Sequence, residues 1–381
     1  MSEQSVNKTY SRNSAFEILR LIAIVFIIAH HFSVHGGFNF GALEQTTTVI
    51  TNTIWIDFIG QLGKVGVNLF VLISSFFLID NTRFRTKKLI ALLLEMLVFS
   101  LAIGLSFFFY YKKEFSIDWL NTIIFPFGTS VWWYMTAYLI LYLLSPLINL
   151  GIRAMNKKLH LILTIVCLFI WSFMPTFVLV NYAFSNLGWF ITLYLIGSYI
   201  KLYGDDFKVK PWVGILLSIG IFISWFAIKT GINYGIPNRH YLLNRFLRVF
   251  NLIEMGNSVQ VFCTILMFVS FSKINMKSYK WINVLASTTL AIYLLHDHGD
   301  TRHFLWLDFF KNASYSSSIY LIPYSIGVIL GVFVAGLAIG LIYRYTFGLG
   351  FNKLLDLLER KLLYKIDNIV NNQPTENNVQ N

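Results

Sequence analysis

Four titratable side chains lie within one hydrophobic segment near the start of the chain, residues 16–34, which reads FEILRLIAIVFIIAHHFSV. They are Glu17, Arg20, His30 and His31. A charged group at membrane depth costs on the order of 3 kcal/mol, so such groups normally face a protein interior or an aqueous cavity. Imidazole supplies acid–base chemistry near neutral pH, and guanidinium binds phosphates and carbonyl oxygens.

The spacing places the arginine and one histidine on the same side of a helix. Arg20 and His31 are eleven residues apart, and at about 100° per residue this makes three turns plus about 20°. At a rise of about 1.5 Å per residue they lie about 16 Å apart along the axis, roughly half of a 30 Å hydrocarbon core. Glu17 stands one turn before Arg20, within reach of an ion pair, whereas His30 projects about 100° away from His31.

An alternative interpretation needs no function for these residues. Arg20 can extend its side chain to one membrane interface, while the histidines lie in the headgroup layer of the other. For Arg20 alone both interpretations stay open. For the four residues together we favour a functional site, because each charged or titratable group adds to the cost of insertion.

The composition predicts an all-α, polytopic transmembrane bundle of about ten spans. Of 381 residues, 56% are hydrophobic and 13% are charged, whereas soluble domains carry about 25% charged residues. The net charge of +12 arises from short basic clusters between apolar segments, which indicates membrane topology and not a nucleic-acid partner. Cys167 and Cys263 fall in apolar segments and support neither a disulfide framework nor a thiolate metal site. The predicted spans are residues 16–34, 65–79, 89–111, 130–150, 160–180, 187–202, 212–228, 250–271, 281–295 and 319–345.

Lys and Arg are concentrated in the loops on the side that carries both termini, which predicts cytoplasmic termini in a cell membrane. Residues 1–15 are expected to form a cytoplasmic tail, residues 16–345 the membrane domain, and residues 346–381 a charged cytoplasmic tail. Residues 35–60 contain no Lys or Arg and are expected to form an external loop, as are residues 229–249.

The segment EILRLIAIVFIIAHH resembles the signature of the acyltransferase 3 family of multi-pass cell-surface O-acyltransferases, an arginine followed after ten residues by a histidine. Arg20 and His31 match it, and Glu17 stands where many members have an acid. Four further segments resemble the family in the same order along residues 13–345. They are GVNLFVLISSFFLI (66–79), VWWYMTAYLILYLLSPLIN (131–149), LGWFITLYLIGSYI (187–200) and TLAIYLLHD (289–297).

One departure from the family pattern lies in the second span. Members usually carry Ser-Gly before an aromatic residue, where this chain has Ser74, Ser75 and Phe76. Since glycine allows close backbone approach, helix packing or donor access is expected to differ here.

The resemblance implies acyl transfer, usually of acetyl from cytoplasmic acetyl-CoA to a hydroxyl of an extracytoplasmic or lipid-linked glycan in the bacterial plasma membrane. Such O-acetylation belongs to exopolysaccharide or capsule biosynthesis. His31 would act as general base or carry the acyl group, and Arg20 would hold a phosphate or the carbonyl of the donor. The expected partners are therefore an acyl-CoA donor, a saccharide acceptor and the lipid bilayer, and no metal is expected.

Further residues are candidates for supporting roles, each beside a structural alternative. The basic run Arg83, Arg85, Lys87 and Lys88 would receive CoA phosphates, although ordinary positive-inside topology is the interpretation we favour. His296 and Asp297 would form a His–carboxylate pair that supports the site. With His298 and His303 they also resemble a metal site, which we do not expect, because loop histidines at such spacings are common.

Other candidates depend on weaker patterns. Trp133 would stack on a sugar, but an aromatic belt together with Trp132 and Tyr134 is favoured. Asn68 and Ser74 are minor candidates that do not share a helix face. The intramembrane acids Glu95 and Glu254 are candidate proton or substrate contacts, and the sequence assigns no partner to either.

Two other function classes fit part of the sequence. A transporter or flippase for a glycan or lipid-linked sugar would also place charges at membrane depth, although the chain shows no inverted repeat. A non-catalytic component of a polysaccharide assembly complex would keep the motifs after losing the chemistry, and Ser75 is the residue that suggests it.

Overall fold

The computed structural model describes residues 13–178, 185–235 and 256–371, and in these ranges the chain forms helices and no strand. Glu254 and most of the expected external loop over residues 229–249 lie outside them. The helices are α1 (Ser14–His35), α2 (Thr47–Gly60), α3 (Leu62–Leu78), α4 (Thr86–Tyr110), α5 (Ile117–Ile124), α6 (Trp133–Ala154), α7 (Lys157–Leu168), α8 (Asn186–Tyr203), α9 (Pro211–Gly235), α11 (Ser258–Ser272), α12 (Lys280–Ala286), α13 (Thr289–His296), α14 (Gly299–His303), α15 (Leu321–Tyr345), α16 (Phe347–Leu358) and α17 (Tyr364–Asn371).

Seven helical segments in the described ranges are long and apolar enough to cross a membrane. They coincide with seven of the expected spans. The other three expected spans fall on α8, on the shorter apolar helix α11, and on α12 followed by α13. The all-α polytopic fold class is confirmed.

The segment expected to be an external loop, residues 35–60, contains the helix α2. Thr46 caps this helix by accepting a hydrogen bond from the backbone N–H of Val49 at 3.3 Å. Val49, Ile56 and Ile59 are buried against the bundle. Residues 47–60 are therefore a packed helix and not a loop.

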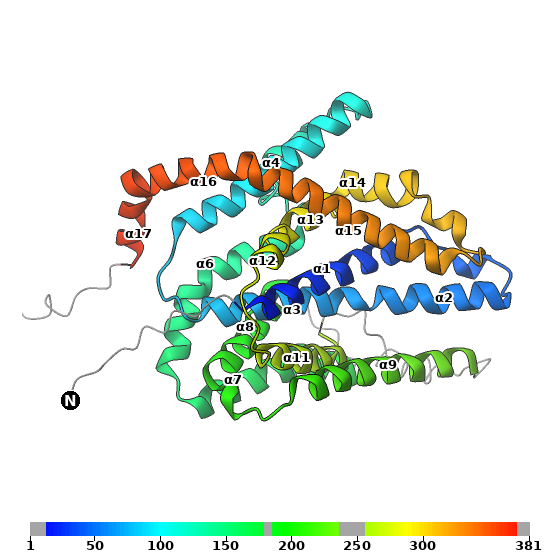
Figure 1. Cartoon of the computed structure of the whole chain (residues 1–381), viewed down its shortest axis with the longest axis horizontal. Coiled ribbons are helices and arrows are strands. Elements are labelled where there is room, and N and C mark those ends of the chain that lie inside the picture. Colours follow the sequence, from blue (N-terminus) through cyan, green and yellow to red (C-terminus); the bar gives the residue numbers. More distant parts are fainter. Residues whose placement is uncertain (1–12, 179–184, 236–255, 372–381) are drawn as a thin grey trace, which may run out of the picture.

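Helices α1 and α3 run side by side through the middle of the bundle, with α9 and α11 along one side and α15 along the other (Figure 1). Two glycines of α3 make the close contact possible. A Cβ atom at Gly63 would lie 2.3 Å from the His30 ring, and one at Gly66 would lie 2.5 Å from the carbonyl oxygen of Ala23. Small residues at such positions let two helix backbones approach.

The span expected over residues 281–295 is broken between α12 and α13. The break falls at three consecutive hydroxyl residues, which donate hydrogen bonds to carbonyls of the preceding turn at 2.7, 2.7 and 2.9 Å. Such bonds compete with the regular helical ladder and favour a kink or break. The three residues are Ser287, Thr288 and Thr289.

Ser75, which replaces the family glycine, is accommodated by its neighbour on α8. A Cβ atom at Gly197 would lie 2.1 Å from the Ser75 hydroxyl oxygen, so the glycine on the opposite helix supplies the space. The Ser75 hydroxyl is buried and donates to the carbonyls of Val71 and Leu72 at 2.8 and 3.0 Å. The substitution thus changes an α3–α8 contact.

The charged C-terminal segment packs against the start of α4. Asp367 accepts a hydrogen bond from the backbone N–H of Thr86 at 2.9 Å. Asn371 accepts from the N–H of Phe84 at 2.7 Å and donates to the carbonyl of the same residue at 3.0 Å. Helices α16 and α17 therefore hold the segment that carries the basic cluster.

Candidate active site

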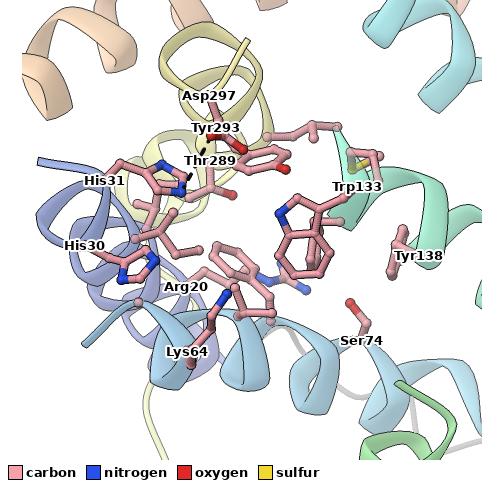
Figure 2. Close-up of a pocket in the computed structure, with 18 of the residues that line it drawn as sticks. Arg20, His30, His31, Lys64, Ser74, Trp133, Tyr138, Thr289, Tyr293 and Asp297 are labelled. Atoms are coloured by element: carbon pink, nitrogen blue, oxygen red, sulfur yellow. Dashed lines mark ion pairs between the residues drawn. The ribbon is translucent and has the colours of Figure 1, made fainter. Parts of the chain in front are cut away.

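One cavity of about 640 Å³ lies among α1, α3, α4, α6 and the broken pair α12–α13 (Figure 2). It follows α1, since residues of this helix from Arg20 to His35 line it, and its lining also includes Lys88, Ser287 and Arg302. Most of its wall is apolar or aromatic. The sequence-predicted residues that line it are Arg20, His30, His31, Ser74, Lys88, Trp133 and Asp297.

The histidine of the family signature faces a carboxylate inside this cavity. His31 Nε2 lies 3.6 Å from Asp297 Oδ1, and Figure 2 shows the two side chains meeting between α1 and the end of α13. Asp297 Oδ1 also lies 3.5 Å from Arg302 Nη1, which is 3.4 Å from His35 Nε2. Both His31 and Asp297 are buried. This geometry suits a general base whose orientation is fixed by an acid.

The predicted pairing of Asp297 with its neighbour His296 is wrong. His296 is buried, and its Nδ1 donates to the carbonyl oxygen of Ile292 at 2.6 Å. Adjacent helical residues project about 100° apart, so two neighbours at a helix end do not face one another. The His296 ring instead packs 5.1 Å from the His31 ring. His296 thus packs against His31 without lining the cavity.

The two adjacent histidines have different surroundings. His30 Nδ1 lies 2.5 Å from the carbonyl oxygen of Gly60, so this ring is tied to the backbone at the α2–α3 junction. His31 faces Asp297. The structure therefore distinguishes His31 as the group with a carboxylate partner, although both rings line the cavity.

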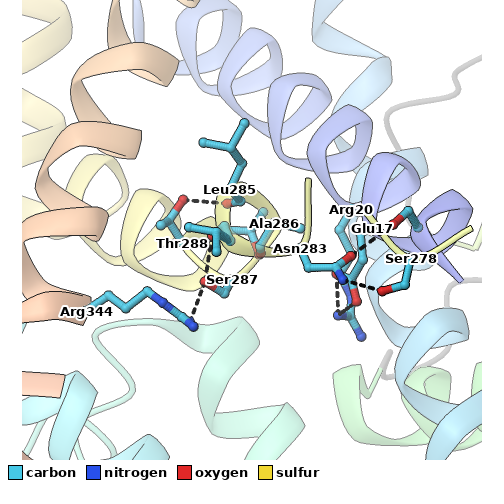
Figure 3. Close-up of polar contacts among 12 residues, drawn as sticks. Glu17, Arg20, Ser278, Asn283, Leu285, Ala286, Ser287, Thr288 and Arg344 are labelled. Atoms are coloured by element: carbon cyan, nitrogen blue, oxygen red, sulfur yellow. Dashed lines mark hydrogen bonds and ion pairs between the residues drawn. The ribbon is translucent and has the colours of Figure 1, made fainter. Parts of the chain in front are cut away.

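Arg20 lines the other part of the cavity and is held by Glu17. Its Nη1 atom lies 3.1 and 2.9 Å from the two carboxylate oxygens of Glu17, which itself does not line the cavity. Figure 3 shows this pair beside α12, on whose other side Arg344 donates to the Ser287 hydroxyl at 2.7 Å. Glu17 thus orients the arginine.

Three basic side chains of the cavity were not proposed from the sequence. Lys64, His35 and Arg302 all line it. Lys64 stands at the start of the second predicted span and Arg302 follows the ninth, where basic residues are ordinarily taken as topology signals. Only the packing of α3 against α1, and of α14 against α13 and α4, brings their side chains to the same space.

Other predicted residues lie outside the cavity. Asn68 is buried between α3, α8 and α11, where it accepts from Trp189 Nε1 at 2.9 Å and lies 3.4 Å from the Gln260 side chain. Arg83 and Arg85 line a smaller pocket of about 70 Å³ that shares Lys88 with the main cavity. Lys87 is bound by two acids of the C-terminal segment, Asp356 and Glu359.

Two hydrogen bonds to Asp300 fix the position of α14. Asp300 accepts from Lys113 Nζ at 2.6 Å and from Trp119 Nε1 at 3.0 Å. Burial raises the pKa of Asp300, but the bonds from Lys113 and Trp119 lower it more, so the net pKa lies below the usual value. The ionised Asp300 carboxylate and its two donors therefore hold the helix that carries Arg302.

His31, His35 and Asp297 could also supply ligands to a metal ion, because one candidate ligand atom from each lies within 4.8 Å of the others. Arg302 Nη1, however, lies within 3.5 Å of atoms of both His35 and Asp297. A fixed guanidinium charge at that distance opposes the binding of a second cation. The donor set therefore fits an arginine-held carboxylate better than a metal centre.

A model of an acyltransferase domain family matches residues 13–344. The chain therefore belongs to the acyltransferase 3 family, as its five segments indicated, and is an acyl-transferring membrane protein. No curated protein and no solved structure matched it in the corresponding comparisons.

Proposed function

We propose that this protein is an O-acyltransferase that moves an acyl group, in the first instance acetyl, from cytoplasmic acyl-CoA to a hydroxyl of an extracytoplasmic or lipid-linked polysaccharide in a bacterial plasma membrane. The observation that carries the proposal is a single cavity that contains Arg20 and Lys88 towards one end and His31, Asp297 and Arg302 towards the other. With both termini cytoplasmic, the first group faces the donor and the second faces the acceptor.

The chemistry is a single displacement. His31, oriented by Asp297, takes the proton of an acceptor hydroxyl as the oxygen attacks the thioester carbonyl carbon. The new C–O bond forms while the carbonyl electrons move onto oxygen. When the carbonyl reforms, the C–S bond breaks, and the CoA thiolate receives the proton from the His31 imidazolium.

The donor is held from the cytoplasmic side. Arg20 and Lys88 offer charge-assisted hydrogen bonds to phosphate or carbonyl oxygens, and Arg83 and Arg85 line the adjoining pocket. The narrow pantetheine arm then carries the thioester along the cavity, so CoA itself does not cross the membrane.

The test is transfer in proteoliposomes. Acetyl-CoA labelled in the acetyl group is added on one side, and the polysaccharide and lipid-linked saccharide fractions of a host lacking the protein are supplied on the other. We expect labelled ester in a saccharide fraction only with the protein present. Flux of saccharide without ester formation would instead make the protein a transporter.

Replacement of Arg20 by methionine should weaken donor binding. A hydrogen bond to a charged group contributes about 1.5–3 kcal/mol, so the KM for acetyl-CoA should rise about 10- to 100-fold. Glu17→Gln, which leaves the arginine in place without the charge of its partner, should have a smaller effect. An unchanged KM in Arg20→Met protein would remove Arg20 from the donor site.

Weakening the contact between the C-terminal segment and the start of α4 should also weaken donor binding. Asp367→Ala removes two hydrogen bonds to Thr86, each contributing about 1 kcal/mol. We expect an increase of about 3- to 10-fold in the KM for acetyl-CoA with kcat nearly unchanged, because the basic cluster loses its fixed position. Lys353→Gln, at an exposed position of α16 away from the contacts with Thr86 and Lys87, serves as the comparison. A fall in kcat alone would contradict this positioning role.

A further inference from the structure

Glu95, one of the intramembrane acids of the sequence, lines another pocket that the proposed acyl transfer does not use. This pocket of about 220 Å³ lies among α4, α13, α15 and α16, which pack against one another in a ring. Its polar lining includes Arg344 from the last turn of α15, Asn352 from α16, and Ser287 between α12 and α13. The pocket is far larger than a single water molecule requires, so it has room for a ligand.

The pocket keeps two opposite charges apart from each other. Glu95 lines it from α4 and Arg344 from α15, and no ion pair joins these two described side chains. Arg344 Nη1 donates instead to the Ser287 hydroxyl at 2.7 Å (Figure 3). Opposite charges within a membrane normally pair with each other. Two that line one pocket without meeting fit a ligand with the complementary charges, anionic beside Arg344 and cationic beside Glu95.

The pocket opens where the bundle meets lipid, near one membrane surface. Its lining residues Tyr345 and Leu349 are largely exposed. The first half of α4 and the last turn of α15, where Arg344 lies, both line it, so it lies towards the ends of two spans. The next helix, α16, exposes Phe347 and Leu354, as a helix at a membrane interface does. These are the surroundings of a phospholipid headgroup.

A phosphodiester and a primary ammonium complement the two charges of the pocket. Arg344 can bind a phosphate through paired N–H groups, and Asn352 adds an amide donor from α16. A primary ammonium has three N–H donors for the Glu95 carboxylate. A choline headgroup has no N–H donor, and a glycerol headgroup carries no cation. The lining therefore distinguishes between ordinary membrane phospholipids.

We propose that this pocket binds a phospholipid headgroup with a phosphate and a primary ammonium, as in phosphatidylethanolamine. The phosphate lies against Arg344 and Asn352, the ammonium binds Glu95, and the acyl chains follow the exposed apolar surfaces of α15 and α16. Binding of the lipid does not depend on the proposed acyl transfer, so the two can fail separately.

The experiment measures lipid binding to the purified full-length protein in detergent by native mass spectrometry. Phosphatidylethanolamine, phosphatidylcholine and phosphatidylglycerol with identical acyl chains are titrated separately. We expect the wild-type protein to bind phosphatidylethanolamine about 10-fold or more tightly than the other two, because each of them lacks the charged hydrogen bond to Glu95. Glu95→Gln should lose this preference, and Arg344→Gln should weaken phosphatidylethanolamine binding about 10- to 100-fold.

Further variants separate this site from general effects. Arg344→Lys keeps a positive charge and should bind phosphatidylethanolamine more tightly than Arg344→Gln does. The matched controls are Glu114→Gln and Arg360→Gln, which change an exposed acid and an exposed base outside the pocket. Both should bind the three lipids as the wild-type protein does. Melting temperatures establish that each variant is folded.

Four results would overturn the proposal. One is equal binding of the three lipids by the wild-type protein, and another is an unchanged preference in folded Glu95→Gln protein. The third is a loss in Arg360→Gln equal to that in Arg344→Gln, which would indicate general attraction to a basic segment. The fourth is binding of water-soluble glycerophosphoethanolamine as tight as that of the lipid, which would make a soluble phosphate ester the ligand.

Discussion

Replacement of His31 by alanine should reduce acyl transfer about 1,000-fold or more, since general base catalysis contributes about 10²–10⁴-fold. The alanine leaves Asp297 and Arg302 in place but removes the group that accepts the hydroxyl proton. Binding of acetyl-CoA should be preserved, because the donor contacts lie around Arg20 and Lys88. Initial rates of ester formation in proteoliposomes, together with acetyl-CoA binding by calorimetry, check both expectations.

The control for His31→Ala is His303→Ala. His303 is exposed on the adjoining helix α14 and pairs with Asp308 at 3.3 Å outside the cavity. The His303→Ala protein should transfer the acyl group at the wild-type rate. Normal transfer by the His31 variant would remove the proposed mechanism, whereas loss of donor binding would show that His31 acts in the donor site and not as the base.

Replacement of Asp297 by asparagine should reduce transfer nearly as much as His31→Ala does, with kcat lowered about 100-fold or more. The amide keeps the shape of the side chain but no longer stabilises an imidazolium on His31, 3.6 Å away. It also leaves the charge of Arg302 without its carboxylate, which should lower the melting temperature. Turnover and thermal unfolding in detergent measure the two effects separately.

A second substitution separates catalysis from stability. In the Asp297→Asn, Arg302→Gln protein both members of this ion pair are neutral, so stability should recover while transfer stays low. Asp308→Asn, an exposed acid on the same side of the molecule, provides the comparison. Recovery of activity together with stability would show that Asp297 serves only to neutralise Arg302.

The sequence alone determined the fold class and three charged or titratable residues of α1 that line the cavity, Arg20, His30 and His31. Hydrophobic segments of membrane-spanning length predict helices because the backbone has no other hydrogen-bond partner in lipid. The helical repeat then places Arg20 and His31 on one face from their spacing alone. Glu17 was predicted to pair with Arg20 for the same reason, and the ion pair is present. These features depend on residues close together in the chain.

Contacts between distant segments were decided only by the tertiary structure. Asp297 meets His31 and not His296, because the end of α13 packs against α1 and neighbouring side chains diverge. Lys64 enters the cavity because Gly63 allows α3 to approach His30, and Ser75 is tolerated because Gly197 faces it on α8. Periodicity gives the face that a residue occupies on its own helix. Which faces of two helices pack together depends on the volumes of the side chains on both helices. These side chains are far apart in the sequence and meet only when the chain folds.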